Sequence, residues 1–189
     1  MPALFGSPPP SAIPHDWGVS PCLDLINSHW SDHLGSGASY DRLPVARFRR
    51  AFLGRWHLDA GDLDDPQLQS ELAHLRALLR NVLEGYASGR PMTESTKRRL
   101  EAEMNRAPLA LNASLQHRRS GGRRDAVLAE IATSAAQLIA ERRTVKVCAN
   151  PNCSWMFVDE SRPGTRRWCN TGVCGSLINV RRYRHAHRD

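Results

Sequence analysis

The sequence predicts a mostly helical α+β protein, in which a helical amino-terminal domain with a small hairpin precedes a small cysteine-rich module. Two long segments, residues 67–87 and 125–142, carry apolar residues at three- and four-residue steps, which is typical of helices packed on one core. Hydrophobic residues make up 41% and charged residues 24% of the 189 residues, so the chain can build such a core. Four of the five cysteines lie between residues 148 and 174.

Residues 1–14 are expected to form a disordered leader, because they contain five prolines and no charged side chain. They lack the basic start and the long apolar run of a secretory signal peptide. No other apolar run is long enough to span a bilayer. We therefore expect a cytoplasmic protein without membrane association, in a compartment that keeps thiols reduced.

The amino-terminal domain is expected to span residues 15–143 and to begin with a short helix. This helix starts at Pro21, includes Trp30 and ends before the glycine-containing segment 35–37. Residues 40–61 carry a second apolar helical face, which a glycine closes.

The clearest helix covers residues 67–87. Asp65 and Pro66 supply its cap and its first-turn proline. The hydroxyl of Thr93 is expected to cap a further helix, which Pro108 ends because proline cannot continue it.

A small hairpin is predicted between this helix and the last one of the domain. Leucine and alanine residues alternate from Leu109 to Leu115, which predicts a strand, and the segment 120–122 (SGG) predicts the turn. Asp125 is expected to cap the helix over residues 125–142.

The four clustered cysteines have the spacing C-x4-C-x15-C-x4-C, which is typical of a metal site. So short a segment cannot build a hydrophobic core, and metal binding would supply its folding free energy. Thiolates are preferred ligands of structural, tetrahedral zinc. We predict one structural Zn²⁺ per chain, held by Cys148, Cys153, Cys169 and Cys174. The fifth cysteine, Cys22, is expected to be a small buried apolar residue.

Residues 144–189 are expected to fold as a treble-clef-like zinc finger. Asn150 and the proline after it favour a tight knuckle inside the first cysteine pair. A strand over residues 154–158 is predicted to pair with a return strand at 166–168. A helix over residues 175–187 is predicted to follow the second pair.

Both parts of the chain resemble the CGNR zinc-finger proteins, bacterial transcription regulators in which this finger follows an amino-terminal ABATE domain. The matching segments are residues 21–28 (PCLDLINS), 148–153 (CANPNC), 155–162 (WMFVDESR), 166–169 (RRWC), 173–175 (VCG) and 180–184 (VRRYR). The resemblance implies a stress-linked transcription regulator with an ABATE-like domain over residues 15–143 and a CGNR-like finger over 144–189. The family has Asn-Arg after its last cysteine and glycine, where this chain has Ser176 and Leu177.

Most of the net charge of +7 lies in the finger, since residues 144–189 carry eight basic and three acidic residues, or +5. Arginines suit a polyanion, because a guanidinium binds phosphate bidentately. We expect DNA as the partner, with candidate contacts Arg166, Arg167, Arg181, Arg182, Arg184 and Arg188. Ser176 and Leu177 offer little to base edges, so phosphate contacts are expected to dominate. The sequence also allows a homodimer and a small-molecule ligand of the amino-terminal domain, without identifying either.

No catalytic constellation is present in the sequence, so we do not expect an enzyme. Four thiolates would leave zinc without an open position, and there is no phosphate-binding loop or G-x-S-x-G motif. Two alternatives to DNA binding stay open. One is a protein-interaction adaptor, and the other is a thiol redox sensor that releases its metal on oxidation.

His29 and His33 are four residues apart and would share one face of a helix. A second metal there would need a further ligand, for which only His15 and Asp32 are near in sequence. A polar helix face is the simpler interpretation.

Asp24 and Asn27 stand in an otherwise apolar helical segment. We expect them to brace the core by hydrogen bonds rather than to line a ligand cavity. Arg162 is expected to form an ion pair with Asp159 that braces the predicted hairpin of the finger.

Overall fold

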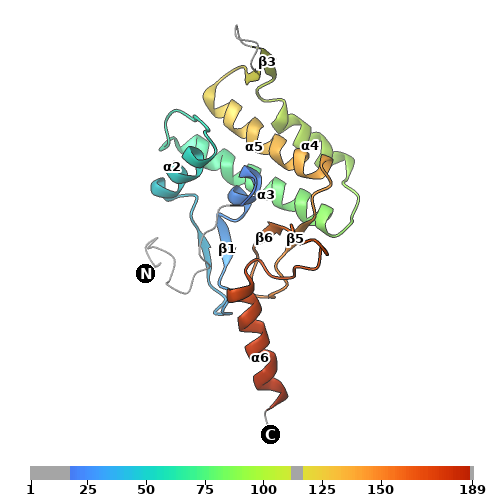
Figure 1. Cartoon of the computed structure of the whole chain (residues 1–189). Helices are drawn as coiled ribbons and strands as arrows, with labels where there is room; N and C mark the ends of the chain where they lie inside the picture. The colour runs from blue at the N-terminus through green and yellow to red at the C-terminus, as the bar shows by residue number, and fades with distance from the viewer. Residues whose placement is uncertain (1–17, 112–116, 188–189) are drawn as a thin grey trace.

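Three long helices pack together in the upper part of the molecule, and a sixth helix extends from its other end (Figure 1). The structure is a computed structural model that describes residues 18–111 and 117–187. The helices are α1 (Pro21–Ile26), α2 (Ala46–Arg55), α3 (Pro66–Ala87), α4 (Glu94–Met104), α5 (Arg123–Ala140) and α6 (Ser176–Ala186). Helix α5 packs against α3 and α4, and the short α1 packs against α3 and α5. Among the described residues, no helix has both the length and the apolar character that a bilayer span requires.

The predicted starts of α3 and α4 are confirmed. The carboxylate of Asp65 accepts a hydrogen bond from the backbone N–H of Gln67 (2.8 Å), and Pro66 follows as the first helical residue. The hydroxyl of Thr93 accepts one from the N–H of Thr96 (3.2 Å). Both caps satisfy N–H groups that have no partner inside the helix.

The predicted start of α5 is wrong. This helix begins at Arg123, after a glycine, so Asp125 lies within its first turn rather than before it. The Asp125 carboxylate accepts a hydrogen bond from Nε of Arg106 (2.9 Å), beyond the end of α4. Asp125 therefore ties two helices together instead of capping one.

Three separate two-stranded antiparallel sheets complete the described fold. They pair β1 (His29–Ser31) with β2 (Ser39–Asp41), β3 (Leu109–Leu111) with β4 (His117–Arg119), and β5 (Val145–Val147) with β6 (Met156–Val158). The β3–β4 pair confirms the small hairpin, but its predicted turn is wrong, because residues 120–122 follow β4 and lead into α5. Residues 112–116, which include the end of the predicted strand, lie outside the described residues, as do residues 1–17.

The first predicted helix is shorter than expected, and a hairpin replaces its second half. Helix α1 ends at Ile26, where the hydroxyl of Ser28 donates to the carbonyl of Leu25 (2.7 Å). Trp30 lies in β1, opposite Tyr40 of β2, and the two rings stack with centroids 4.7 Å apart. Residues 32–38 connect the strands, and we call them the β1–β2 turn.

One hydrophobic core runs through both parts of the chain. Leu79 of α3 and Leu128 of α5 are fully buried in it. Val145, Met156 and Val158 of the β5–β6 sheet belong to the same cluster, although they follow residue 143 in the sequence. The first half of the finger is therefore packed directly on the helices.

The polar residues of α1 brace this core, in agreement with the sequence analysis. Asp24 accepts hydrogen bonds from the indole N–H of Trp56 (2.8 Å) and from the N–H of Gly18, and burial raises the pKa of its carboxyl. Asn27, at the end of α1, pairs with both backbone groups of Met156. Its Nδ2 donates to the carbonyl (2.8 Å), and its Oδ1 accepts from the N–H (2.9 Å).

Candidate metal centre and the adjoining basic helix

The four predicted ligands come together next to the start of α6. The sulfur atoms of Cys148, Cys153, Cys169 and Cys174 lie within 4.8 Å of one another, and all four side chains are buried. Cys153 and Cys169 are 3.8 Å apart, and Cys169 and Cys174 are 3.7 Å apart. Sulfur–zinc distances of about 2.3 Å in a regular tetrahedron place sulfurs about 3.8 Å apart. The donor set therefore fits one tetrahedral zinc ion.

The thiols are unequal in their affinity for protons. Hydrogen bonds from the other thiols hold the pKa of Cys148 well below its usual value. Hydrogen bonds to Cys148 and its neighbours raise the pKa of Cys169. A divalent cation at the centre would replace these shared protons and hold all four sulfurs as thiolates.

Each cysteine pair is held by a different local structure. Cys148 directly follows β5, and its N–H donates to the carbonyl of Trp155 (2.9 Å) across the knuckle. Cys153 closes the knuckle by donating its N–H to the carbonyl of Asn150 (2.8 Å), as the sequence predicts for a tight turn. Cys174 lies in the π-helical turn η1 (Thr171–Gly175), which leads directly into α6.

The hairpin of the finger differs from the prediction. Strand β6 pairs with β5 and not with residues 166–168, which form no strand. A single backbone bond from the N–H of Ala149 to the carbonyl of Arg167 (2.9 Å) brings that segment back to the knuckle. The treble-clef-like centre is thus assembled on a sheet whose two strands flank the knuckle with Cys148 and Cys153.

The predicted ion pair between Arg162 and Asp159 is also wrong. Asp159 pairs with Lys146 of β5 (2.6 Å), which the sequence analysis did not single out. The same carboxylate accepts hydrogen bonds from the N–H of Ser161 (2.9 Å) and the N–H of Arg166 (2.9 Å). These bonds hold the pKa of Asp159 well below its usual range. Arg162 is exposed.

Replacing Asp159 by alanine is expected to loosen the segment between β6 and Cys169. Four donors, including the ammonium of Lys146 and two backbone N–H groups, would lose their acceptor. We expect the melting temperature of the zinc-loaded protein to fall by several degrees, measured by circular dichroism. The matched change Arg162→Ala should leave it unchanged. Equal effects of the two substitutions would contradict this assignment.

Of the arginines predicted to contact DNA, one binds within the finger and the other described ones are exposed. The guanidinium of Arg166 donates to the carbonyls of Trp168 (2.9 Å) and Cys169 and lies over the ring of Phe157, so it serves the finger itself. The other described candidates, Arg167, Arg181, Arg182 and Arg184, are exposed. Arg188 lies outside the described residues.

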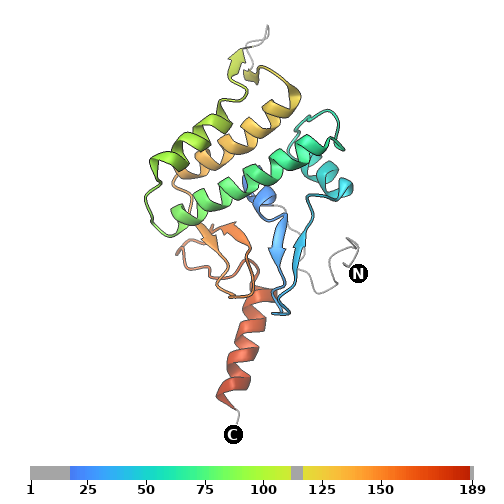
Figure 2. The same ribbon diagram turned by 180° about the vertical axis from the view of Figure 1, so that it is seen from behind.

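Helix α6 begins at a close contact and then extends freely (Figures 1 and 2). A Cβ on Gly175 would lie 2.9 Å from Cδ1 of Trp168, so only glycine fits between the last ligand and this ring. Every residue from Asn179 to His187 is exposed. The side chains of Tyr183 (65% exposed) and His187 stack with ring centroids 4.1 Å apart.

The second metal site considered for His29 and His33 does not form among the described residues. His29 is exposed in a strand, whereas His33 is buried in the β1–β2 turn, so they share no helical face. In the described ranges, the four cysteines are the one group of at least three metal-ligating side chains. Cys22 is buried within the helical core, as predicted for an apolar role, and burial raises the pKa of its thiol.

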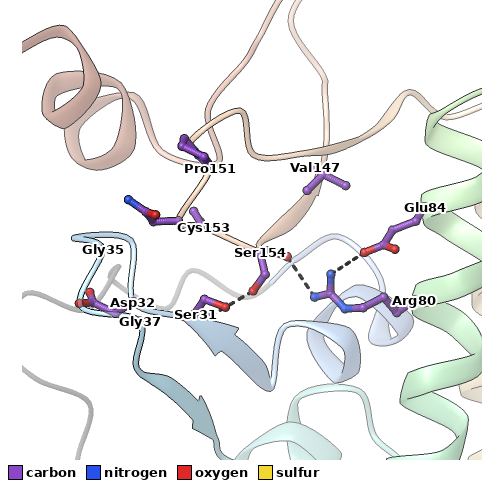
Figure 3. Close-up of a pocket in the computed structure, with 11 residues that line it drawn as sticks. Ser31, Asp32, Gly35, Gly37, Arg80, Glu84, Val147, Pro151, Cys153 and Ser154 are labelled. Atoms are coloured by element: carbon purple, nitrogen blue, oxygen red, sulfur yellow. Dashed lines mark hydrogen bonds and ion pairs between the residues drawn. The ribbon is translucent and has the colours of Figure 1, made fainter. Parts of the chain in front are cut away.

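A polar pocket of about 380 Å³ lies between α3, the β1–β2 turn and the knuckle (Figure 3). Arg80 of α3 donates to Glu84 (2.9 Å) and to the carbonyl of Ser154 (3.0 Å). The hydroxyl of Ser154 accepts the N–H of Ser31 (3.1 Å). The pocket therefore marks where the amino-terminal part meets the metal centre, a junction that sequence spacing could not reveal.

Comparison with known families gives two matches. The CGNR zinc finger matches residues 144–187. ABATE, described as "Putative stress-induced transcription regulator", matches residues 20–142. No curated protein matches the chain. Because the second match covers well over half of its residues, the chain belongs to the ABATE family, with a CGNR zinc finger at its carboxyl end.

Proposed function

We propose that this protein is a cytoplasmic, DNA-binding transcription regulator whose finger is folded around one structural zinc ion. Cys148, Cys153, Cys169 and Cys174 would hold the metal, which supplies the folding free energy that the small surrounding cluster lacks. Four thiolate ligands leave no open position for substrate, so the proposal assigns no catalysis to this centre.

The observation that carries the proposal is the exposed, basic helix that leaves the metal centre. Between Glu160 and Asp189 the chain has seven arginines and no acidic residue. Three of these arginines, Arg181, Arg182 and Arg184, lie on α6. A helix of this length is about 16 Å long and about 10–12 Å wide. These dimensions fit the major groove, which is about 12 Å wide.

Binding of this kind would rest mainly on phosphates. Arg167, Arg181, Arg182, Arg184 and Arg188 supply cations, which position a protein on DNA without reading its sequence. Leu177, which stands in place of the family's arginine, is half-buried at the base of α6. We therefore expect weak discrimination between DNA sequences.

The role of the positive charge of α6 in DNA binding can be tested by replacing two exposed arginines on this helix. In Arg182→Ala/Arg184→Ala, affinity for random duplexes should fall for all sequences alike. The slope of log affinity against log salt should become shallower by about 0.9 for each phosphate that the variant no longer neutralises. Fluorescence anisotropy of the zinc-loaded protein with labelled duplexes at several salt concentrations measures both quantities.

The matched control is Arg50→Ala/Arg90→Ala, which removes two exposed arginines from the helical part. It should leave the slope unchanged. Equal slopes for both double variants would show that DNA does not contact α6. No duplex binding by the zinc-loaded wild-type protein at low salt would overturn the DNA proposal itself.

A protein-interaction adaptor is the second candidate. Val180 and Tyr183 are apolar side chains on α6 and are 47% and 65% exposed. Such residues are typical of helix faces that dock on another protein. Binding to a protein partner through α6 would persist at salt concentrations that release a phosphate-bound duplex.

A further inference from the structure

The β1–β2 turn contacts the finger through three successive residues, each of which is more than 100 residues away in sequence from its partner. The buried side chain of Asn150 donates from Nδ2 to the carbonyl of His33 (3.0 Å). The guanidinium of Arg181, in the middle of α6, donates to the carbonyl of Leu34. Figure 3 shows the turn facing the knuckle, and the nearest neighbour of Gly35 there is the side chain of Asn152. The amino-terminal domain thus reaches both the metal ligands and α6 through one short segment.

The contact through Asn150 continues to a metal ligand. The same Nδ2 lies 3.5 Å from the sulfur of Cys174, and Oδ1 accepts the N–H of Asn152 (3.1 Å). Asn150 is fully buried, so its orientation is fixed by these partners. Groups that donate hydrogen bonds to metal ligands hold them in place and stabilise their charged form.

A larger residue at position 35 would collide with the side chain of Asn152 in its present position. A Cβ there would lie 2.7 Å from Nδ2 and 3.2 Å from Cγ of Asn152, one residue before the ligand Cys153. Gly37 offers a natural comparison on the same turn. Both glycines have positive φ (90° and 79°), but a Cβ on Gly37 would meet nothing within 4 Å.

We propose that the β1–β2 turn is part of the metal centre: it holds Asn150 against Cys174, and so the amino-terminal domain sets the zinc affinity of the finger. The inference rests on the proposed zinc site. The carbonyl of His33 fixes the amide whose other contact is the Cys174 sulfur, and Gly35 lets the turn approach the knuckle closely enough for this bond. A change in the turn would therefore reach a ligand that lies about 140 residues away in sequence.

The test compares two alanine substitutions of equal backbone strain in the full-length protein. Gly35→Ala should lower zinc affinity about tenfold, the lower end for groups that support metal ligands. Gly37→Ala should leave it unchanged. The double variant Gly35→Ala/Asn152→Ala should regain affinity, because the side chain that obstructs the new methyl group is gone. Competition of Zn²⁺ between the protein and a chromophoric chelator measures each affinity.

The route through Asn150 is tested with Co²⁺ as a spectroscopic probe. Asn150→Asp keeps the size of the side chain and the acceptor for Asn152, but it loses the donor to His33 and Cys174. We expect the thiolate-to-cobalt absorption bands to shift and Co²⁺ affinity to fall, whereas Asn179→Asp on α6 should change neither.

The outcomes separate this inference from the proposed zinc site. If the wild-type protein binds neither metal, the zinc site itself is wrong. If the wild type binds and Gly35→Ala equals Gly37→Ala, or if Asn150→Asp leaves the cobalt spectrum unchanged, the turn has no part in the metal centre.

Discussion

Removing zinc with a chelator is expected to unfold residues 148–175, abolish duplex binding and leave α3 and α5 folded. The cluster around the centre contains Trp30, Trp155 and Phe157 with the four cysteines, so the metal is its main organising contact. Structural zinc contributes on the order of 10 kcal/mol to folding at neutral pH. The helices instead bury leucines in a core that contains no metal ligand.

Hydrogen exchange followed by mass spectrometry measures this effect segment by segment. Amides of the knuckle and of η1 should lose protection, whereas those in the middle of α3 and α5 should keep most of theirs. Protection of β5 and β6 should fall only in part, because Val145 and Met156 belong to the helical core. Cys22→Ser should retain full zinc and wild-type exchange. Unchanged exchange in the knuckle after complete metal removal would contradict a structural role for the metal.

Replacing Asn27 by alanine is expected to be strongly destabilising, although this residue lies outside the metal centre. Its side chain satisfies both the carbonyl and the N–H of Met156, a buried strand residue (1% exposed). A buried backbone group without a partner costs about 1–3 kcal/mol. We expect the free energy of unfolding to fall by about 2–5 kcal/mol, which corresponds to a loss of about 5–15 °C in melting temperature for a chain of this size.

Thermal and urea denaturation of the zinc-loaded protein measure this loss. Asn179→Ala is the matched control, because Asn179 is exposed on α6 and should change the free energy of unfolding by less than about 0.5 kcal/mol. A loss in Asn27→Ala no larger than in this control would show that water or a shifted strand replaces the amide.

The features that depend only on neighbouring residues, such as helix caps and helical periodicity, could be predicted from the sequence. The cap at Asp65, the cap at Thr93 and the periodic leucines of α3 act within a few residues, and each is confirmed. The paired spacing likewise predicted that the four cysteines come together. One pair belongs to the knuckle, and the other lies just before the last helix.

Contacts between distant segments account for what the sequence could not predict. Trp30 has the spacing of a helical residue, but its ring is buried in a hairpin beside the cysteines. Lys146 carries no motif of its own, and it reaches Asp159 only because β5 pairs with β6. His33 and Asn150 are 117 residues apart, and no spacing rule links them.

Helix α6 behaves mechanically as a lever fixed at one end. Its base is held where Gly175 meets Trp168, Arg181 ties its middle to the carbonyl of Leu34, and its residues beyond Ile178 are exposed. Over a length of about 16 Å, a tilt of about 10° at the base displaces the far end by about 3 Å. That displacement is close to the rise of one base pair along DNA, about 3.4 Å. In the proposed complex with DNA, the alignment of Arg182 and Arg184 with phosphates would therefore depend on two contacts, that of Gly175 with Trp168 and the bond from Arg181 to the carbonyl of Leu34.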